Sequence, residues 1–203
     1  QSLGETLREA RCHPGYLLLT LGFFVCGFQV QFIAIHLPAY IVDQGLTASL
    51  AATAIVVIAA ANGFGAWFAG WAGGVYRKRY LLSGIYGGRA LLFLVLISVP
   101  LSPLVMLVLS VGIGLLWLGT VPLTSGLVAD MFGPRYMATL YSFVFLSHQL
   151  GSFTGVWLGG WIYDATGSYQ IVWWLTIALG IATSVIHLPI DDRPVPRLVA
   201  NRA

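Results

Sequence analysis

Six long runs of apolar residues occupy most of this 203-residue chain, at 15–42, 48–73, 80–100, 104–128, 138–163 and 169–190. Only one charged side chain, that of Arg89, lies inside a run. A helix needs about 20 apolar residues to cross a bilayer, so each run is long enough. Charged residues make up 8% of the chain, against about 25% in soluble domains. We therefore exclude a soluble fold and expect an all-α membrane domain of six transmembrane helices over residues 15–190.

The basic residues gather on one side of this domain, before the first span, after the sixth, and in the 74–79 and 129–137 loops. They are Arg8, Arg11, Arg77, Lys78, Arg79, Arg135, Arg193, Arg197 and Arg202. The opposite loops carry only Asp43 and Asp164. Positively charged short loops stay in the cytoplasm, so we expect a multi-pass protein of the cell inner (plasma) membrane. The lead-in 1–14 and the tail 191–203 would both be cytoplasmic. A net charge of +3 spread over such loops does not indicate nucleic-acid binding.

The chain contains an internal repeat at an offset of 90 residues. The segment 65–71, GAWFAGW, aligns with 155–161, GVWLGGW, at four identical positions of seven. The second span thus corresponds to the fifth, which divides the domain into units of three spans at about 15–100 and 104–190. Because three is odd, the second unit enters the membrane from the opposite side, and the repeat is inverted. Inverted repeats are typical of transporters.

Helical periodicity places small residues and polar side chains together on the faces expected to pack against protein. His148 shares a face with glycines of the fifth span, and Asn62 shares one with Gly65 of the second. Polar groups at this depth need partners, and ionisable ones indicate function. His148 could carry a proton or contact a solute, or it could be a neutral side chain bonded to a neighbouring helix. Gln29 in the first span favours an interhelical hydrogen bond, and His36 is expected to be solvated.

Two further features concern the third and fourth spans. Pro122 removes a backbone hydrogen bond and predicts a kink beside Trp117 and Thr120, a pattern that suits a movable cavity wall. Arg89 lies opposite the small residues of its span. We therefore expect its side chain to reach the cytoplasmic surface or to pair with Asp130, rather than to face a central cavity.

Two stretches carry a family resemblance: DMFGPR at 130–135, and YDATGSY at 163–169 after glycines at 151, 155, 159 and 160. With these residues the chain resembles the carboxyl-terminal half of bacterial major facilitator superfamily transporters. It is most similar to their oxalate/formate antiporter and monocarboxylate transporter branch. The resemblance implies helices seven to twelve of a twelve-helix transporter, in which two six-helix halves rock around a central site.

By this resemblance the first, second, fourth and fifth spans would line the cavity, with Gln29, Asn62, Trp117, Thr120 and His148 as candidate substrate-binding residues. The cytoplasmic loop residues implied for gating are Arg77, Lys78, Arg79, Asp130 and Arg135. The chain departs from the family at 70–74, GWAGG, where an Asp that helps lock the gate is usual. The second span also lacks the Arg that is common in members that bind carboxylates.

The sequence therefore favours half of a secondary active transporter that moves a small organic solute, and a carboxylate is one candidate. Its expected partners are the lipid bilayer and a second six-helix half, either a separate chain or a second copy. The alternative is a non-transporting membrane subunit that packs or anchors a partner complex. A haem protein would need two histidines at matched depth, which the chain does not offer. We expect no enzyme activity, no cofactor and no metal, because no catalytic or metal-ligand motif is present.

Overall fold

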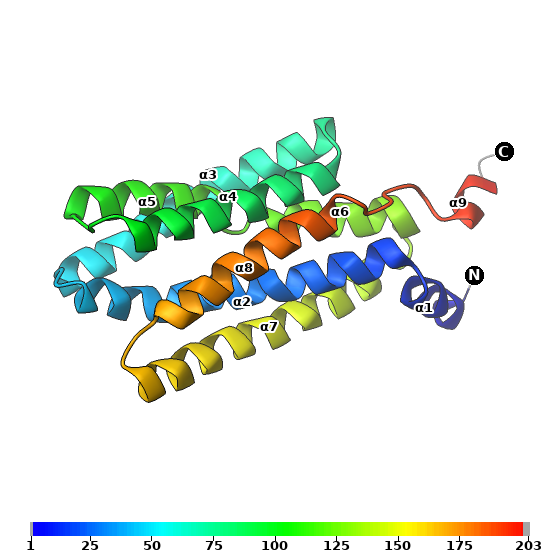
Figure 1. The fold of residues 1–203 in the computed structure, drawn as a ribbon. Coiled ribbons are helices and arrows are strands. Elements are labelled where there is room, and N and C mark those ends of the chain that lie inside the picture. Colours follow the sequence, from blue (N-terminus) through cyan, green and yellow to red (C-terminus); the bar gives the residue numbers. More distant parts are fainter. Residues whose placement is uncertain (1, 201–203) are drawn as a thin grey trace.

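The computed structural model describes residues 2–200, with side chains up to residue 198, and every element in this part of the chain is a helix. The helices are α1 (Leu3–Arg11), α2 (Pro14–Asp43), α3 (Ala48–Val75), α4 (Lys78–Ser98), α5 (Pro103–Leu115), α6 (Thr120–Phe132), α7 (Met137–Thr166), α8 (Gln170–His187) and α9 (Pro196–Ala200). The long helices lie side by side in one bundle, and α1 and α9 lie at one end of it (Figure 1). The prediction of an all-α fold is confirmed.

Each predicted span coincides with a long helix, except that the fourth is divided between α5 and α6. Within the described residues, five helical stretches are long and apolar enough to cross a membrane, if Pro103–Phe132 is counted as one. The helix that does not reach this apolarity is α7, although it has 30 residues. Its apolar content is diluted by a polar stretch around Ser147, His148 and Gln149.

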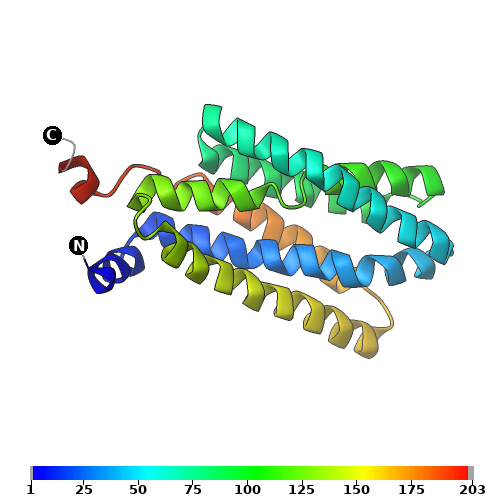
Figure 2. The ribbon, with the colours of Figure 1, turned by 180° about the vertical axis from the view of Figure 1, so that it is seen from behind.

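The division of the fourth span lies at 116–119, and Figure 2 shows it as a non-helical link between two short helices. Pro122, which we expected to kink a continuous helix, instead lies in the first turn of α6. The first backbone N–H groups of a helix have no partner within it, so proline costs little there. The chain thus breaks before the proline and begins a new helix around it.

Helices α2 and α7 pack with their backbones in contact. A side chain at Gly27 would place its Cβ 1.9 Å from the carbonyl oxygen of His148, and one at Gly155 would meet the carbonyl oxygen of Phe28 at 2.4 Å. Neither distance can be accommodated, so glycine is required on both helices. Close approach through small residues is how membrane helices associate when lipid is as apolar as their side chains.

The same arrangement recurs between α3 and α5. A Cβ at Gly65 would lie 2.1 Å from the carbonyl oxygen of Leu115, and one at Gly114 would lie 2.5 Å from that of Ile58. Gly65 aligns with Gly155 of α7 in the 90-residue repeat. In this repeat the first span, α2, corresponds to the fourth, which begins with α5, and the fifth span, α7, corresponds to the second, α3. The contact between α2 and α7 therefore corresponds to the contact between α5 and α3. This is the packing expected of an inverted repeat.

The buried apolar side chains form two clusters. One, around Phe32 and Trp173, lies nearer the turn that follows α2, and the other, around Phe23 and Phe132, lies nearer the chain termini. The α5–α6 break lies between them along the bundle, and Trp117 packs against both. The polar groups described below are therefore at mid-bundle.

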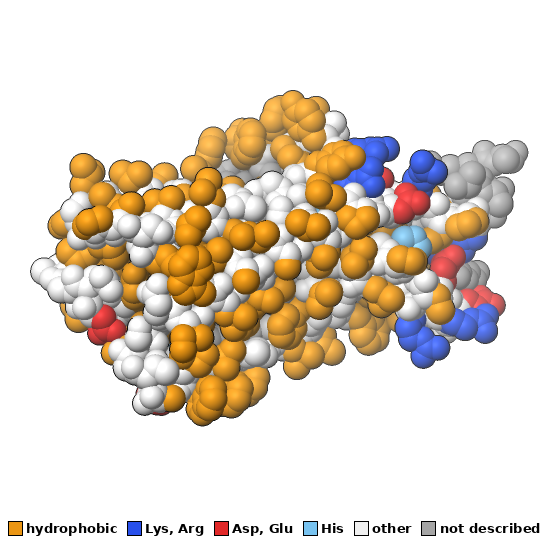
Figure 3. Space-filling view, in the orientation of Figure 1, with side chains coloured by type: hydrophobic (Ala, Val, Ile, Leu, Met, Phe, Trp, Pro, Cys, Tyr) orange, Lys and Arg blue, Asp and Glu red, His pale blue; other side chains and the backbone are white. Residues whose placement is uncertain are grey.

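The two ends of the bundle differ in charge. We call the end with the chain termini the terminal end, and the end formed by the turns 43–47, 99–102 and 166–169 the distal end. Figure 3 shows the Lys and Arg side chains gathered at the terminal end, with apolar side chains over most of the flank. Among the described residues, the charged side chains at the distal end are only those of Asp43 and Asp164. Both ends of the described chain lie at the terminal end, as the loop charges predict (Figure 1).

Candidate functional site

A network of buried polar groups lies at the break between α5 and α6, and Arg89 of α4 is at its centre. The Arg89 side chain is 2% exposed. Its Nε donates a hydrogen bond of 2.7 Å to the carbonyl oxygen of Leu116, and Nη2 donates one to the carbonyl oxygen of Trp117. The last carbonyl groups of a helix have no partner within it, and they carry its negative dipole end. Leu116 caps α5 and Trp117 follows it, so Arg89 places a full positive charge beside this end of α5.

The other side of the guanidinium faces α2. Its Nη1 donates to Oε1 of Gln29 at 3.3 Å and approaches Sγ of Cys26 at 3.6 Å. The amide nitrogen of Gln29 donates to the carbonyl oxygen of Thr176 in α8 at 3.1 Å. The Cys26 sulfur also lies 3.1 Å from the hydroxyl of Thr120 in α6. One network thereby connects α2, α4, α6 and α8.

Asn62 of α3 holds the opposite side of the break. Its Oδ1 accepts a hydrogen bond of 2.9 Å from the backbone N–H of Leu118. The break leaves carbonyl groups from α5 and an N–H group ahead of α6, and side chains from two other helices satisfy both kinds. Buried backbone groups without partners are costly in a membrane, so these side chains make a non-helical segment possible at this depth.

His148 of α7 lies beside this network and is 6% exposed. Its ring lies against those of Phe23 and Phe145, with centroid separations of 4.8 and 5.4 Å. Nδ1 lies 3.2 Å from Oε1 of Gln149 and 3.4 Å from Oγ of Ser152. Nε2 is buried without a partner at hydrogen-bond distance, and the thiol of Cys26 is the polar group that interacts with the ring from α2. The prediction that His148 faces protein is confirmed.

The structure brings four of the five sequence-predicted site residues together. Gln29, Thr120 and the backbone of Trp117 meet around Arg89, His148 lies next to Cys26, and Asn62 holds the far side of the break. Gln29 and Thr120 are almost fully buried and contact other helices rather than an open cavity. A solute could reach them only after these helices separate.

The expectation for Arg89 was wrong. The buried face of α4 is its large-residue face, which includes Leu82, Tyr86, Arg89 and Phe93, whereas its glycines are partly exposed. Arg89 therefore points into the bundle, and Asp130 pairs with another cation. A stripe of large residues at helical spacing is the signal that would have identified this face. Cys26 was also not among the candidates, although it contacts three members of the network.

His36 was expected to be solvated, and this is also wrong. It is 9% exposed, and Nε2 lies 3.0 Å from the carbonyl oxygen of Val156 while Nδ1 lies 3.2 Å from the hydroxyl of Tyr169. The ring joins α2 to α7 and to the turn before α8. Proximity to the end of a helix did not predict exposure, because the α7–α8 turn covers this position.

The predicted loop residues lie together at the terminal end and are held by separate contacts. Lys78 Nζ lies 2.6 Å from Oδ2 of Asp130, which joins the start of α4 to the end of α6. Arg79 donates to the carbonyl oxygen of Ile190 at 2.6 Å, and Arg77 lies 4.0 Å from Asp192. The remaining member, Arg135, is exposed and lies over the ring of Tyr136 at 5.2 Å.

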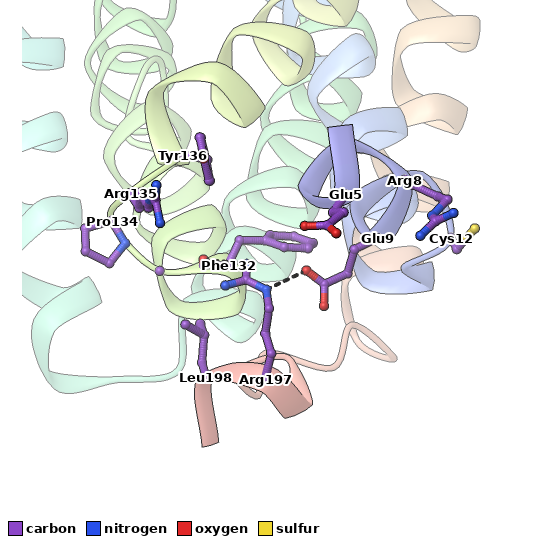
Figure 4. Close-up of a pocket in the computed structure, with 11 residues that line it drawn as sticks. Glu5, Arg8, Glu9, Cys12, Phe132, Pro134, Arg135, Tyr136, Arg197 and Leu198 are labelled. Atoms are coloured by element: carbon purple, nitrogen blue, oxygen red, sulfur yellow. Dashed lines mark hydrogen bonds and ion pairs between the residues drawn. The ribbon is translucent and has the colours of Figure 1, made fainter. Parts of the chain in front are cut away.

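A second terminal-end contact joins the two ends of the described chain. Arg197 of α9 donates to Oε2 of Glu9 in α1 at 2.8 Å and to the carbonyl oxygen of Phe132 at 3.1 Å. Figure 4 shows the Arg197–Glu9 contact at the edge of a cavity of about 890 Å³ that Arg8 and Arg135 also line. We call this contact the terminal clasp. Within the described residues, no group of three His, Cys, Asp or Glu side chains is placed to hold a metal ion.

A bundle of long apolar helices, one of them broken at mid-bundle around buried polar groups, is the architecture of a membrane transport protein. Residues 17–203 match the profile of the Major Facilitator Superfamily, and the chain belongs to this superfamily. A relative in Bacillus subtilis (strain 168), described as the uncharacterized MFS-type transporter YcxA, is 25% identical over 192 residues. The alignment covers 84% of this chain and 43% of that relative, so the chain spans less than half of its length. The family and the relative both point to a transporter.

Proposed function

We propose that this chain forms one half of a secondary active transporter that moves a small organic solute by alternating access. The observation that carries the proposal is the α5–α6 break, whose backbone groups are held by Arg89 and Asn62 at mid-bundle. Transporters of this type place their sites near the bilayer midplane, where broken helices meet between repeats. The matched glycine contacts of α2 with α7 and of α3 with α5 support an inverted repeat around this point.

The second half would be another six-helix unit, as part of a longer polypeptide, as a separate chain or as a second copy. One half cannot enclose a pathway that opens to both membrane faces. The relative's greater length supports a larger assembly. In it, α7 would span the membrane together with the five more apolar stretches, because it packs along α2 through glycine contacts.

The resemblance to the oxalate/formate and monocarboxylate branch would make a carboxylate the solute. A carboxylate site needs a cation with free donors. Among the described residues, Arg89 is the only Lys or Arg within the spanning helices away from their ends, and it already donates to two carbonyl groups, Gln29 and Cys26. The described spanning helices therefore supply no free Lys or Arg for a carboxylate.

In the cell inner membrane, the terminal end would face the cytoplasm, since it carries every described Lys and Arg except Arg89. Single cysteines introduced at Asp164 and Arg193 in a variant lacking native cysteines test this orientation. In intact cells, a membrane-impermeant maleimide should label position 164 and leave position 193 unlabelled. The reverse pattern would overturn the orientation.

Counterflow in proteoliposomes tests the transport function. The assembled protein is reconstituted with a panel of unlabelled organic anions, cations and neutral solutes inside, and uptake of the labelled counterpart is measured. At least one solute should accumulate transiently above its equilibrium level. Absence of counterflow across the panel would favour the alternative of a non-transporting membrane subunit, which the missing Asp at 70–74 supports.

A further inference from the structure

The distal end contains a polar cavity of about 390 Å³ that none of the candidate residues above lines. It lies between the end of α2 and the turn that joins α7 to α8. Its walls are Tyr40, Asp43, Gln44, Tyr163, Gly167, Ser168, Tyr169 and Gln170. The cavity is thus built from one carboxylate, three phenol rings and neutral polar groups.

The charges around this cavity are negative. Asp43 is the last residue of α2, and α2 and α7 both end here after 30 residues. A helix carboxyl end behaves as about −0.5 of an elementary charge. The amino end of α8 also borders the cavity, with an opposite partial charge, but the Ser168 hydroxyl accepts from the N–H of Gln170 at 3.2 Å. No Lys or Arg among the described residues lies at this end to neutralise the carboxylate.

The aromatic wall is fixed by contacts behind it. The rings of Tyr163 and Tyr169 stack at 4.4 Å, and Tyr40 meets Tyr169 edge to face at 6.5 Å. His36 holds the Tyr169 hydroxyl from within the bundle, and a neutral imidazole satisfies both of its contacts. The Tyr163 hydroxyl interacts with the Asp43 carboxylate. Asp43 is exposed to solvent, and its carboxylate lies beside the Tyr163 ring of the cavity wall.

We propose that this distal cavity binds a small organic ammonium ion. The Asp43 carboxylate would accept its N–H donors, and the surrounding phenol rings would attract its charge and cover its carbon atoms. A divalent metal ion fits poorly, because Ca²⁺ takes six to eight oxygen ligands, commonly from several carboxylates, and this cavity has one. Binding at this site does not depend on the proposed transport function. Only a further role of the cavity, as the place where the solute enters, would rest on that function.

Equilibrium binding to the purified protein in lipid nanodiscs tests the proposal. The probe is radiolabelled butylammonium at neutral pH, compared with butanol and butyrate, which match its chain length but are neutral and negative. Butylammonium should bind saturably, and the other two should not. This comparison uses the unaltered protein. Saturable binding of butanol with equal affinity would overturn the proposal, as would no saturable binding of butylammonium.

Two matched variants locate the binding. Asp43→Asn should weaken butylammonium binding on the order of tenfold or more, because a hydrogen bond to a charged group is lost. Asp164→Asn removes the other distal carboxylate, which does not line the cavity, and should leave the affinity unchanged. Equal weakening by both variants would mean diffuse attraction to the distal surface, and displacement by an equal concentration of Na⁺ would mean an inorganic cation site. Either result would overturn the proposal, whether or not counterflow is observed.

Discussion

The guanidinium of Arg89 in α4 donates a hydrogen bond to the backbone carbonyl of Trp117, where the chain leaves α5. An arginine at this depth is costly unless its donors are satisfied. Here the carbonyl groups of Leu116 and Trp117 lie in the link between α5 and α6, so the same contacts satisfy both the link and the guanidinium. The broken helix and the buried cation depend on each other. Neither would be stable in the apolar interior alone.

Replacing Arg89 should therefore destabilise the whole bundle. Arg89→Ala leaves the carbonyl groups of Leu116 and Trp117 without partners, and each buried unsatisfied group costs about 1–3 kcal/mol. We expect a clear fall in the temperature at which the detergent-solubilised protein aggregates, measured by size-exclusion chromatography after heating. Arg89→Lys, which keeps the charge and some donors, should recover part of the loss. Arg135→Ala, an exposed control, should match the parent, and equal behaviour of all three variants would contradict a role for Arg89 in holding the break.

The glycine contacts give a prediction about packing. Gly155→Ala would bring a methyl group to 2.4 Å from the carbonyl oxygen of Phe28, so α2 and α7 must separate. Overpacking of this kind costs about 1–3 kcal/mol. Gly63→Ala is the matched control, because nothing lies within 4 Å of the added carbon and alanine favours helix. The same heating assay should show a loss for Gly155→Ala and none for Gly63→Ala; an unaffected Gly155 variant would show that this face is not tightly packed.

The features that the sequence predicts well are those that depend on periodicity and charge. The long apolar runs gave the helices, the loop charges gave the shared location of the termini, and the small-residue face gave the burial of His148. These properties depend on the order of residues along the chain. Each follows because the bilayer interior excludes charged groups and unpaired backbone groups.

The features that the sequence did not predict depend on contacts between segments far apart in the chain. Arg89 looked exposed because its own helix has glycines on the opposite face, but α5 ends beside it and supplies carbonyl groups. Pro122 indicated an irregularity in its span but not its position, since the break needs Asn62 from α3 to hold the free N–H of Leu118. The sequence therefore named Gln29 and Thr120 as candidates but not Arg89 and Cys26, which join them, because finding these two requires knowing which helix ends meet.

The terminal clasp should restrain the tail. The Arg197 and Glu9 side chains are each 27% exposed, so their ion pair contributes on the order of 1 kcal/mol or less. Arg197→Glu should make the tail after residue 190 more rapidly cleaved by a protease at low concentration, followed by mass spectrometry. The exchange of both charges, Glu9→Arg with Arg197→Glu, should restore much of the protection. If the double variant is cleaved as fast as the single one, the pair does not hold the tail, and the backbone contact from Val195 to Met131 carries the restraint.

His148 offers the sharpest test of a role in transport. Its imidazole is buried against Phe23 and Phe145 beside the thiol of Cys26, and an unperturbed imidazole changes charge near pH 6.5. If counterflow identifies a solute whose uptake depends on a proton gradient, His148→Ala should abolish that dependence while the protein elutes and melts like the parent. His187 is the matched control. It is equally buried, but its Nδ1 is already bonded to the carbonyl oxygen of Thr183 at 2.8 Å, so His187→Asn should lower stability without changing the pH profile of uptake. An unaltered pH profile in the His148 variant would remove this residue from the coupling mechanism and leave its polar contacts with Gln149 and Ser152 as purely structural.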